Sequence, residues 1–325
     1  MPSDPGLAGD TCIFMEAITG DGGNQNPNDV WWLSPDITLK GPVSGFETAD
    51  QGVNKISIKF HRKPAGNCTF PGDESITVQA WVANPSLVMS PHGRGSAARV
   101  GFIGSPLPAE GATQTQQIDW IPPAVNLPTP AENPQKAGPK CLVAICYPDS
   151  LSPSTTAFFV PGDQHVAQHN LSVVKTTSTR VAFIVNTFDP TAGSANVVTP
   201  TPVKLRAVMD LAPTAFVKKM VLSRLQPLPE FQQLRTTGLP NGFGFDLTGL
   251  QATDIVDHSH GSGGLTPPSQ GPSFEAKVQI PGTLTKVTFA ADLKGTQPGQ
   301  ASVFHLTQTR KNVAQGGLTL VLLKT

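Results

Sequence analysis

The residues best suited to chemistry lie in the segment TDIVDHSHGSGG, which contains Asp254, Asp257, His258 and His260. Imidazole nitrogens and carboxylate oxygens are ordinary zinc and nickel ligands, so Asp257, His258 and His260 form a candidate metal site. The segment lies in a Gly- and Pro-rich stretch, residues 239–272, and long loops in compact domains are often functional. A solvated polar loop has the same composition, and no further ligand is fixed by spacing. The favoured interpretation is therefore a loop without metal, and no cofactor is expected.

A second kind of chemistry is stacking by aromatic side chains. Trp31 and Trp32 are adjacent, so on a strand they face opposite sides and one could be exposed. Trp81 falls on the face opposite Ile76, Val78 and Val82. Exposed indoles stack on sugar rings or anchor a protein partner, which makes Trp31, Trp32 and Trp81 candidate ligand-binding residues. The alternative, which the sequence favours, is that these faces are covered by other parts of the chain.

Established catalytic motifs are missing from the sequence. It contains no nucleophile elbow, no H-E-x-x-H motif and no phosphate-binding loop. The acidic, glycine-rich GDGGNQNPND near Asp21 lacks the ligand spacing and terminal Glu of an EF-hand. We therefore expect a protein that is not an enzyme, with no catalytic residue.

Four cysteines are present, at Cys12, Cys68, Cys141 and Cys146. Cys141 and Cys146 are five residues apart, so on one strand they point to opposite faces and do not easily pair with each other. Two alternatives stay open: a bridge from one of them to Cys12 or Cys68, or burial of both as small apolar residues. The set has no C-x-x-C pair and is poorly spaced for zinc.

The elements that must position these residues are short strands. In NKISIKFHRK, apolar Ile56, Ile58 and Phe60 alternate with polar residues, as in a strand with one wet face. The same alternation runs from Ile76 to Val82. Residues 141–147 are apolar on both faces, which predicts a central strand covered on both sides. Clusters of Pro, Gly, Asn and Asp separate these runs, and this pattern favours a β-sandwich.

The residues from Asp29 to Val174 also carry a family resemblance. The matching pieces are SPDI, ISIKFHRKPAGN followed by TVQAWVANPS, IDWIPP at Ile118 to Pro123, and DQHVAQHNLSVV. This stretch resembles the bacterial immunoglobulin-like domains of the CARDB, or cell-adhesion-related, type. In that family an acidic or Asn-rich turn precedes the last strand, and here the corresponding residues are Asp163, Gln164, His165 and Asn170. The resemblance implies a sandwich used as a spacer, an adhesin or an appendage of a secreted enzyme.

The remaining chain predicts a second sandwich after a Thr/Ser linker, KTTSTR. Apolar residues at helical spacing predict a helix that begins near Pro213, and a second helical piece is expected in LPEFQQLRTTG. Strands are expected in SFEAKVQIPG and TLTKVTFAADL, with a terminal hairpin formed by ASVFHLTQTR and GGLTLVLLKT. PG, FHLTQ and GGLTLVL look similar to an immunoglobulin-like tail of bacterial proteins of unassigned role, which implies no activity.

The expected fold is therefore all-β, with two immunoglobulin-like β-sandwich domains, the second with a short helical insertion. The predicted organisation is an N-terminal segment at 1–28, a CARDB-like β-sandwich at 29–176 and a second β-sandwich at 180–325. Helices are expected near 213–236 and a long loop at 239–272. The N-terminal segment is expected to be a tail, with TCIFMEAI as a strand the alternative.

Composition limits the partners. Charged residues make up 14% of the 325 residues, the net charge is +0 and no long basic run occurs, so nucleic acid is not expected. No segment is apolar for long enough to span a membrane. The N-terminus lacks a Sec-type signal peptide, which leaves either a cytoplasmic location or export to the surface by a leader-independent route.

Three functions follow from these patterns. The favoured one is a non-enzymatic structural or adhesive protein that associates with itself or another protein through sheet edges and low-charge faces. The second is a glycan- or protein-binding module. The third is a metal-assisted hydrolase that uses the His258/His260 loop.

Overall fold

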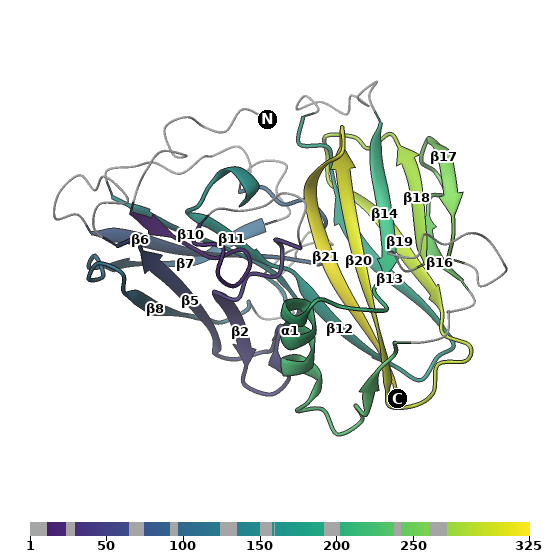
Figure 1. Cartoon of the computed structure of the whole chain (residues 1–325), viewed down its shortest axis with the longest axis horizontal. Helices are drawn as coiled ribbons and strands as arrows, with labels where there is room; N and C mark the ends of the chain where they lie inside the picture. The colour runs from purple at the N-terminus through teal and green to yellow at the C-terminus, as the bar shows by residue number, and fades with distance from the viewer. Residues whose placement is uncertain are drawn as a thin grey trace. The chain divides into compact units, whose positions relative to one another are not determined.

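The computed structural model confirms an all-β sandwich fold with one short α-helix. It describes residues 12–23, 30–64, 75–91, 97–123, 135–149, 158, 160–191, 202–236, 242–259 and 272–325. Figure 1 shows two groups of strands. The first unit comprises Met1–Asn84 and Met89–Asn170, and the second comprises Pro85–Val88 and Leu171–Thr325.

The first sheet of unit 1 is organised around β5 (Asn54–Arg62). Residues 55–58 of β5 pair with β2 and with β8 at once, so these two strands lie on opposite sides of it. The other strands of this sheet are β1 (Ile13–Phe14), β2 (Ile37–Gly41), β3 (Gly45–Phe46) and β8 (Thr113–Trp120). The N-terminal segment is thus not only a tail, because Ile13 and Phe14 pair with Arg62 and His61.

The second sheet of unit 1 has four antiparallel strands. Their order is β11 (Val166–His169), β10 (Cys141–Pro148), β6 (Ile76–Ala83) and β7 (Ala97–Ser105). All residues of β10 are buried, which confirms the predicted central strand covered on both faces. A turn of 3-10 helix, η1 (Val160–Gly162), precedes β11, and a small ladder joins β4 (Thr48–Ala49) to β9 (Gly138–Pro139).

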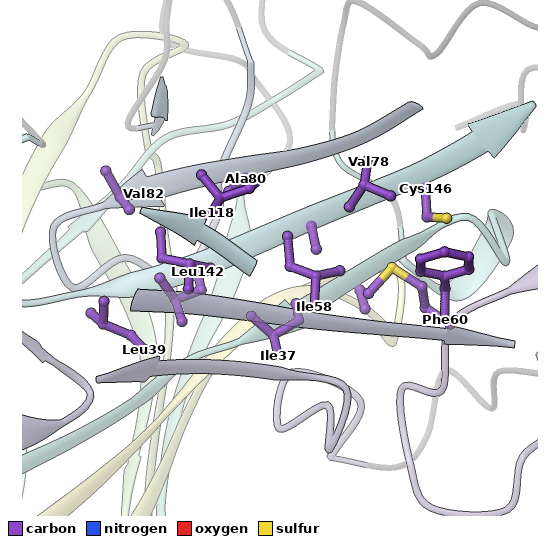
Figure 2. Close-up of a cluster of buried hydrophobic side chains, with 14 of the residues drawn as sticks. Ile37, Leu39, Ile58, Phe60, Val78, Ala80, Val82, Ile118, Leu142 and Cys146 are labelled. Carbon is purple, nitrogen blue, oxygen red and sulfur yellow. The ribbon is translucent and has the colours of Figure 1, made fainter. Parts of the chain in front are cut away.

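The core of unit 1 lies between these two sheets. Figure 2 shows Ile37, Ile58 and Phe60 among the side chains gathered in this cluster. They meet Val78, Ala80 and Val82 of β6 and Leu142 of β10. Strand alternation produces this arrangement, because every second residue of β5 and β6 faces inward. The predicted apolar faces of both strands are confirmed.

The cysteines divide between a bridge and the core. Cys12 is disulfide-bonded, whereas Cys141 and Cys146 are buried thiols of β10. The interpretation of Cys141 and Cys146 as small buried residues is therefore confirmed. Cys68 lies outside the described residues.

Unit 2 also has two sheets. The larger runs in the order β12 (Leu171–Thr176), β21 (Val313–Lys324), β20 (Gln300–Arg310), β14 (Val203–Met209), β18 (Ser273–Val278) and β17 (Ala252–Asp257), with β15 (Gln233–Leu234) beside β20. The smaller has the order β13 (Arg180–Thr187), β19 (Thr285–Asp292) and β16 (Gly242–Asp246). The expected linker at 175–180 instead includes the end of β12 and the start of β13.

Strand β12 belongs to unit 2 because it pairs in parallel with β21 over its whole length. The sequence pattern assigned these residues to the first sandwich, since parallel pairing with a strand so distant along the chain leaves no local signal. A short segment, Pro85–Val88, also belongs to unit 2. Its backbone exchanges two hydrogen bonds with the backbone of Asn186, through Leu87 N–H and the Pro85 oxygen. Gly316 is required beside this segment, because a Cβ atom there would collide with the backbone oxygen of Leu87.

Helix α1 (Ala215–Leu225) confirms the first helical prediction. Its N-cap is Thr214, whose side chain accepts a hydrogen bond from the backbone N–H of Val217 at 3.3 Å. The second predicted helix is wrong: residues 226–232 form turns and Gln233–Leu234 form β15. The segment pairs with another part of the chain instead, since the backbone N–H groups of Gln232 and Arg235 donate to the backbone oxygens of Gly299 and Ala301.

Two further expectations change in unit 2. The predicted long loop at 239–272 contains β16 and β17, and its residues 239–241 and 260–271 lie outside the described residues. The terminal hairpin is present but tighter than expected. Its two-residue turn is Lys311–Asn312, both at positive φ (47° and 63°), which suits the right-handed twist of the flanking strands.

Phe289→Ala tests the core of unit 2. Phe289 is fully buried, and its ring lies 5.2 Å from Phe304 and 6.0 Å from Phe245 between centroids. We expect a loss of about 3–5 kcal/mol in the free energy of unfolding, measured by urea denaturation. The matched control Ile184→Ala, at a side chain 57% exposed, should change it by less than about 0.5 kcal/mol. Equal effects of both variants would contradict the described core.

Candidate functional site

A group of titratable side chains in unit 1 surrounds Asp36, which lies just before β2. Its carboxylate is fully buried, with Oδ1 2.7 Å from Nζ of Lys59 and Oδ2 2.9 Å from Nε2 of His61. The backbone N–H of Glu16 donates to Oδ2 at 2.6 Å. Lys59 and His61 lie on the polar face of β5 that strand alternation predicts. The buried carboxylate thus has a partner at each of its two oxygens.

Two further contacts fix the imidazole of His61. Its Nδ1 lies 2.9 Å from Oγ1 of Thr113, the first residue of β8, and its ring stacks on Phe14 at 4.9 Å between centroids. Thr113, His61 and Asp36 therefore form a hydroxyl–imidazole–carboxylate chain. The same order occurs in hydrolase triads. Here Lys59 already neutralises the carboxylate, so the chain orients His61 within a charge network.

The same place contains the ligand set best suited to a metal among the described residues. One ligand atom each from Glu16, Asp36 and His61 lie within 4.8 Å of one another. Carboxylate and imidazole are suitable zinc ligands. However, the positively charged ammonium of Lys59 already lies at Asp36 and repels a metal ion there. The arrangement therefore fits a structural ion-pair network better than a metal centre.

A second buried polar pair lies elsewhere in unit 1. Nε2 of His169 is 3.2 Å from Oε1 of Glu47, and both side chains are almost completely buried. Nδ1 of His169 lies 2.7 Å from the backbone oxygen of Ser34, which fixes the ring. Glu47 has a positive φ of 62°, so its backbone is held in a conformation uncommon for a side-chain-bearing residue.

Cys146 offers no nucleophile. It is fully buried, and burial together with the negative charge of Asp36 raises the pKa of its thiol well above its ordinary value. Because the thiolate is the reactive form, this cysteine remains an inert thiol.

The structure buries all three tryptophans predicted to bind ligands. Trp31, Trp32 and Trp81 are 0%, 4% and 6% exposed, so none presents an indole face for stacking. Trp31 and Trp32 pack edge to face, and Trp81 packs against Phe158. The indole N–H of Trp81 donates to Gln79 at 3.1 Å. The alternative interpretation, that these faces are covered by the chain, describes what is found.

The candidate metal loop is only partly described. Asp257 ends β17 and His258 follows it, both exposed, and His260 lies outside the described residues. One oxygen of the Asp257 carboxylate accepts hydrogen bonds from the backbone N–H and the hydroxyl of Ser259. The metal hypothesis for these three residues therefore stays a prediction. Asp257 also borders a cavity of about 450 Å³ in unit 2, which Phe243 and Phe274 line as well.

A different feature of unit 1 went unnoticed in the sequence: an open flank, defined here as the outer edges of β7 and β8 (Figure 1). Within the described chain, β7 pairs only with β6 and β8 only with β5. The two strands lie together, because Gln116 donates to Ser105 at 2.9 Å and a Cβ at Gly101 would meet Ile118. Among the strands that the structure describes, both sheets of unit 1 thus end unpaired at this side.

The open flank has few of the devices that usually protect sheet edges. Arg99 is the sole charged residue of β7, Asp119 that of β8, and neither strand contains proline. Strand β8 pairs with β5 through eight consecutive residues without a bulge. Strand β7 has one bulge, next to Arg99, and the β17 edge of unit 2 is bulged between Thr253 and Val256. Regular edge segments with little charge and no proline, such as β8 and residues 101–105 of β7, readily accept another strand.

Comparisons with known proteins give little guidance. No family model and no curated protein matches this sequence. One solved structure, a transglutaminase from red sea bream, is 11% identical with a TM-score of 0.18. The alignment covers 89% of this chain but 31% of that one, so this chain spans under a third of that protein's length. A likeness this weak carries no argument about fold or activity. In the described residues, no helix is long and apolar enough to cross a membrane.

Asp36→Asn tests the charge network. Loss of the carboxylate charge leaves Lys59 and His61 without their partner, and we expect the free energy of unfolding to fall by about 3 kcal/mol. Chemical denaturation of unit 1 provides the measurement. Asp119→Asn on the exposed face of β8 is the matched control and should cost less than about 0.5 kcal/mol. If Asp36→Asn left the free energy of unfolding unchanged, the structural role of the network would be refuted.

The buried side chain of Lys140 should make the free energy of unfolding depend on pH. Burial lowers the pKa of its ammonium from 10.5 to about 8, while Nζ donates to Oδ1 of Asn84 at 2.7 Å. The unfolded chain binds the proton more tightly, so Lys140 disfavours folding below pH 8, and this cost disappears as pH rises toward 10.5. The stability of Lys140→Met relative to wild type should therefore fall by about 3 kcal/mol between pH 7 and pH 11.

The stabilities of Lys140→Met and wild type are compared by denaturation curves recorded at several pH values. Lys55→Met, which removes an exposed lysine of β5, controls for the loss of one surface charge. A difference between Lys140→Met and wild type that does not vary with pH would show that Lys140 is not desolvated in solution.

Proposed function

We propose that this protein is a non-enzymatic structural or adhesive protein that associates through an open sheet edge. The observation that carries the proposal is the open flank of unit 1, where two neighbouring strands end their sheets without charge clusters, proline or, in β8, a bulge. An added strand would satisfy the outward backbone N–H and C=O groups of these edges.

The chemistry of the titratable groups supports a role without catalysis. Asp36 is neutralised by Lys59, and Glu47 is paired with His169 inside the protein. The Cys146 thiol is kept protonated by burial. These groups lie inside the fold beside partners of their own rather than facing a substrate, which favours a role in stability.

Composition and the disulfide at Cys12 support a surface or extracellular setting. Charged residues make up 14% of the chain, compared with about 25% in typical soluble proteins, so little charge opposes association of its surfaces. Disulfides persist mainly in oxidising compartments. Both features suit a protein that assembles or adheres outside the reducing cytosol.

The test is the native mass of the full chain by light scattering over a concentration series. We expect wild type to exceed the 34.2 kDa of one chain, and the double variant Thr115→Lys/Gln117→Lys to shift toward the monomer, because lysines on an edge strand oppose pairing. Thr253→Lys, on the exposed β17 edge, is the matched control and should keep the wild-type mass. A monomeric wild type at micromolar concentration would sink the proposal.

A further inference from the structure

The outer face of β7 carries a protrusion and a gap two residues apart. Phe102 is 67% exposed, and Gly104 is exposed on the same face. A Cβ atom placed on Gly104 would meet nothing within 4 Å. An exposed aromatic ring thus neighbours an unfilled position on the same edge strand.

These two positions are complementary to themselves. In an antiparallel pair of β7 strands centred on Ile103, Phe102 of each copy lies directly opposite Gly104 of the other. A cross-strand aromatic ring covers the exposed glycine backbone and replaces its missing packing, a known means of stabilising sheet edges. A two-fold interface contains this contact twice.

The strand is regular where the pairing is required. Residues 101–105 of β7 pair with residues 80–76 of β6 without interruption, and the bulge lies at the other end, next to Arg99. Ile103 points inward and packs against the core of unit 1, so Phe102 and Gly104 share the outer face. A new strand could therefore extend this sheet without rearranging it.

Strand β8 is compatible with the same axis. Ser105 contacts Gln116, and Gly101 lies against Ile118, so Ile103 lies nearest to Gln117 of β8. A two-fold axis through both layers would place Asp119 of each copy opposite Thr115 of the other. No like charges meet in β8. In β7, Arg99 is four residues from the axis, and its guanidinium lies 5.4 Å from the ring centroid of Phe102 in its own copy.

We propose that the partner at the open flank is a second copy of this chain, an inference that rests on the proposed function. Its β7 pairs antiparallel with β7 about an axis at Ile103, and Phe102 of each copy covers Gly104 of the other. The edge is complementary to itself at Phe102 and Gly104, and no like charges face one another across the axis in β8. A strand from a different protein is the competing occupant.

Charge exchange tests this register. The variant Phe102→Lys/Gly104→Lys places lysine opposite lysine across the axis, whereas Phe102→Lys/Gly104→Glu places each lysine opposite a glutamate. Both variants lose Phe102 and Gly104 equally, and thermal unfolding of each confirms that it folds. We expect the lysine–glutamate variant to dimerise at least about tenfold more tightly than the lysine–lysine variant, by analytical ultracentrifugation.

Two other outcomes would overturn the inference. Equal weakening in both variants would mean that residue 102 does not face residue 104 of a second copy. Wild-type affinity in both variants would place self-association at another edge. In that case the proposed function survives if Thr115→Lys/Gln117→Lys still weakens association, so failure of the register and failure of the function are distinguishable.

Discussion

The pairing of β5 is the interaction on which unit 1 most depends. This strand bonds to β1, β2 and β8, so it joins segments that are distant along the chain. Its inward residues supply Ile56, Ile58 and Phe60 to the core, while its outward residues bring Lys59 and His61 to Asp36. One strand thus supports both the apolar layer and the buried charge network.

The same pairing determines where the sheet ends. Strand β5 pairs with β2 on one side and β8 on the other, and no described strand pairs with the outer side of β8. Strand β8 is therefore an edge among the described residues, and its contacts with β7 bring the edge of the second sheet beside it. Each sheet of a sandwich must end somewhere, and an uncovered end exposes unpaired backbone groups. The proposed association of copies would satisfy those groups.

Much of the fold follows from local patterns in the sequence. Period-2 alternation correctly predicted the inner faces of β5 and β6, and continuous apolarity predicted the burial of β10. Helix α1 was predicted from its spacing. The parallel pairing of β12 with β21 was missed, since it depends on residues about 150 positions away. The second expected helix is not formed, because Gln232 and Arg235 hydrogen-bond to Gly299 and Ala301, a long-range pairing that the local sequence does not report.

The site was less predictable than the fold. Glu16, Asp36 and His61 come from three separate segments, and only tertiary structure brings their ligand atoms within 4.8 Å. The burial of Trp81 depends on Phe158, which no alternation within β6 could reveal. The open flank depends on what does not pair with β7 and β8, and strand patterns do not report sheet order. One signal was available: TQTQQ in β8 is a strand segment without charge.

Hydrogen–deuterium exchange of the wild-type chain at low and high protein concentration tests the central claim most directly. If the open flank is where copies associate, amide protection should rise with concentration in β7 and β8 and stay unchanged in β17, because added strand pairing protects outward N–H groups. Protection that is independent of concentration, or that rises only outside β7 and β8, would contradict the account.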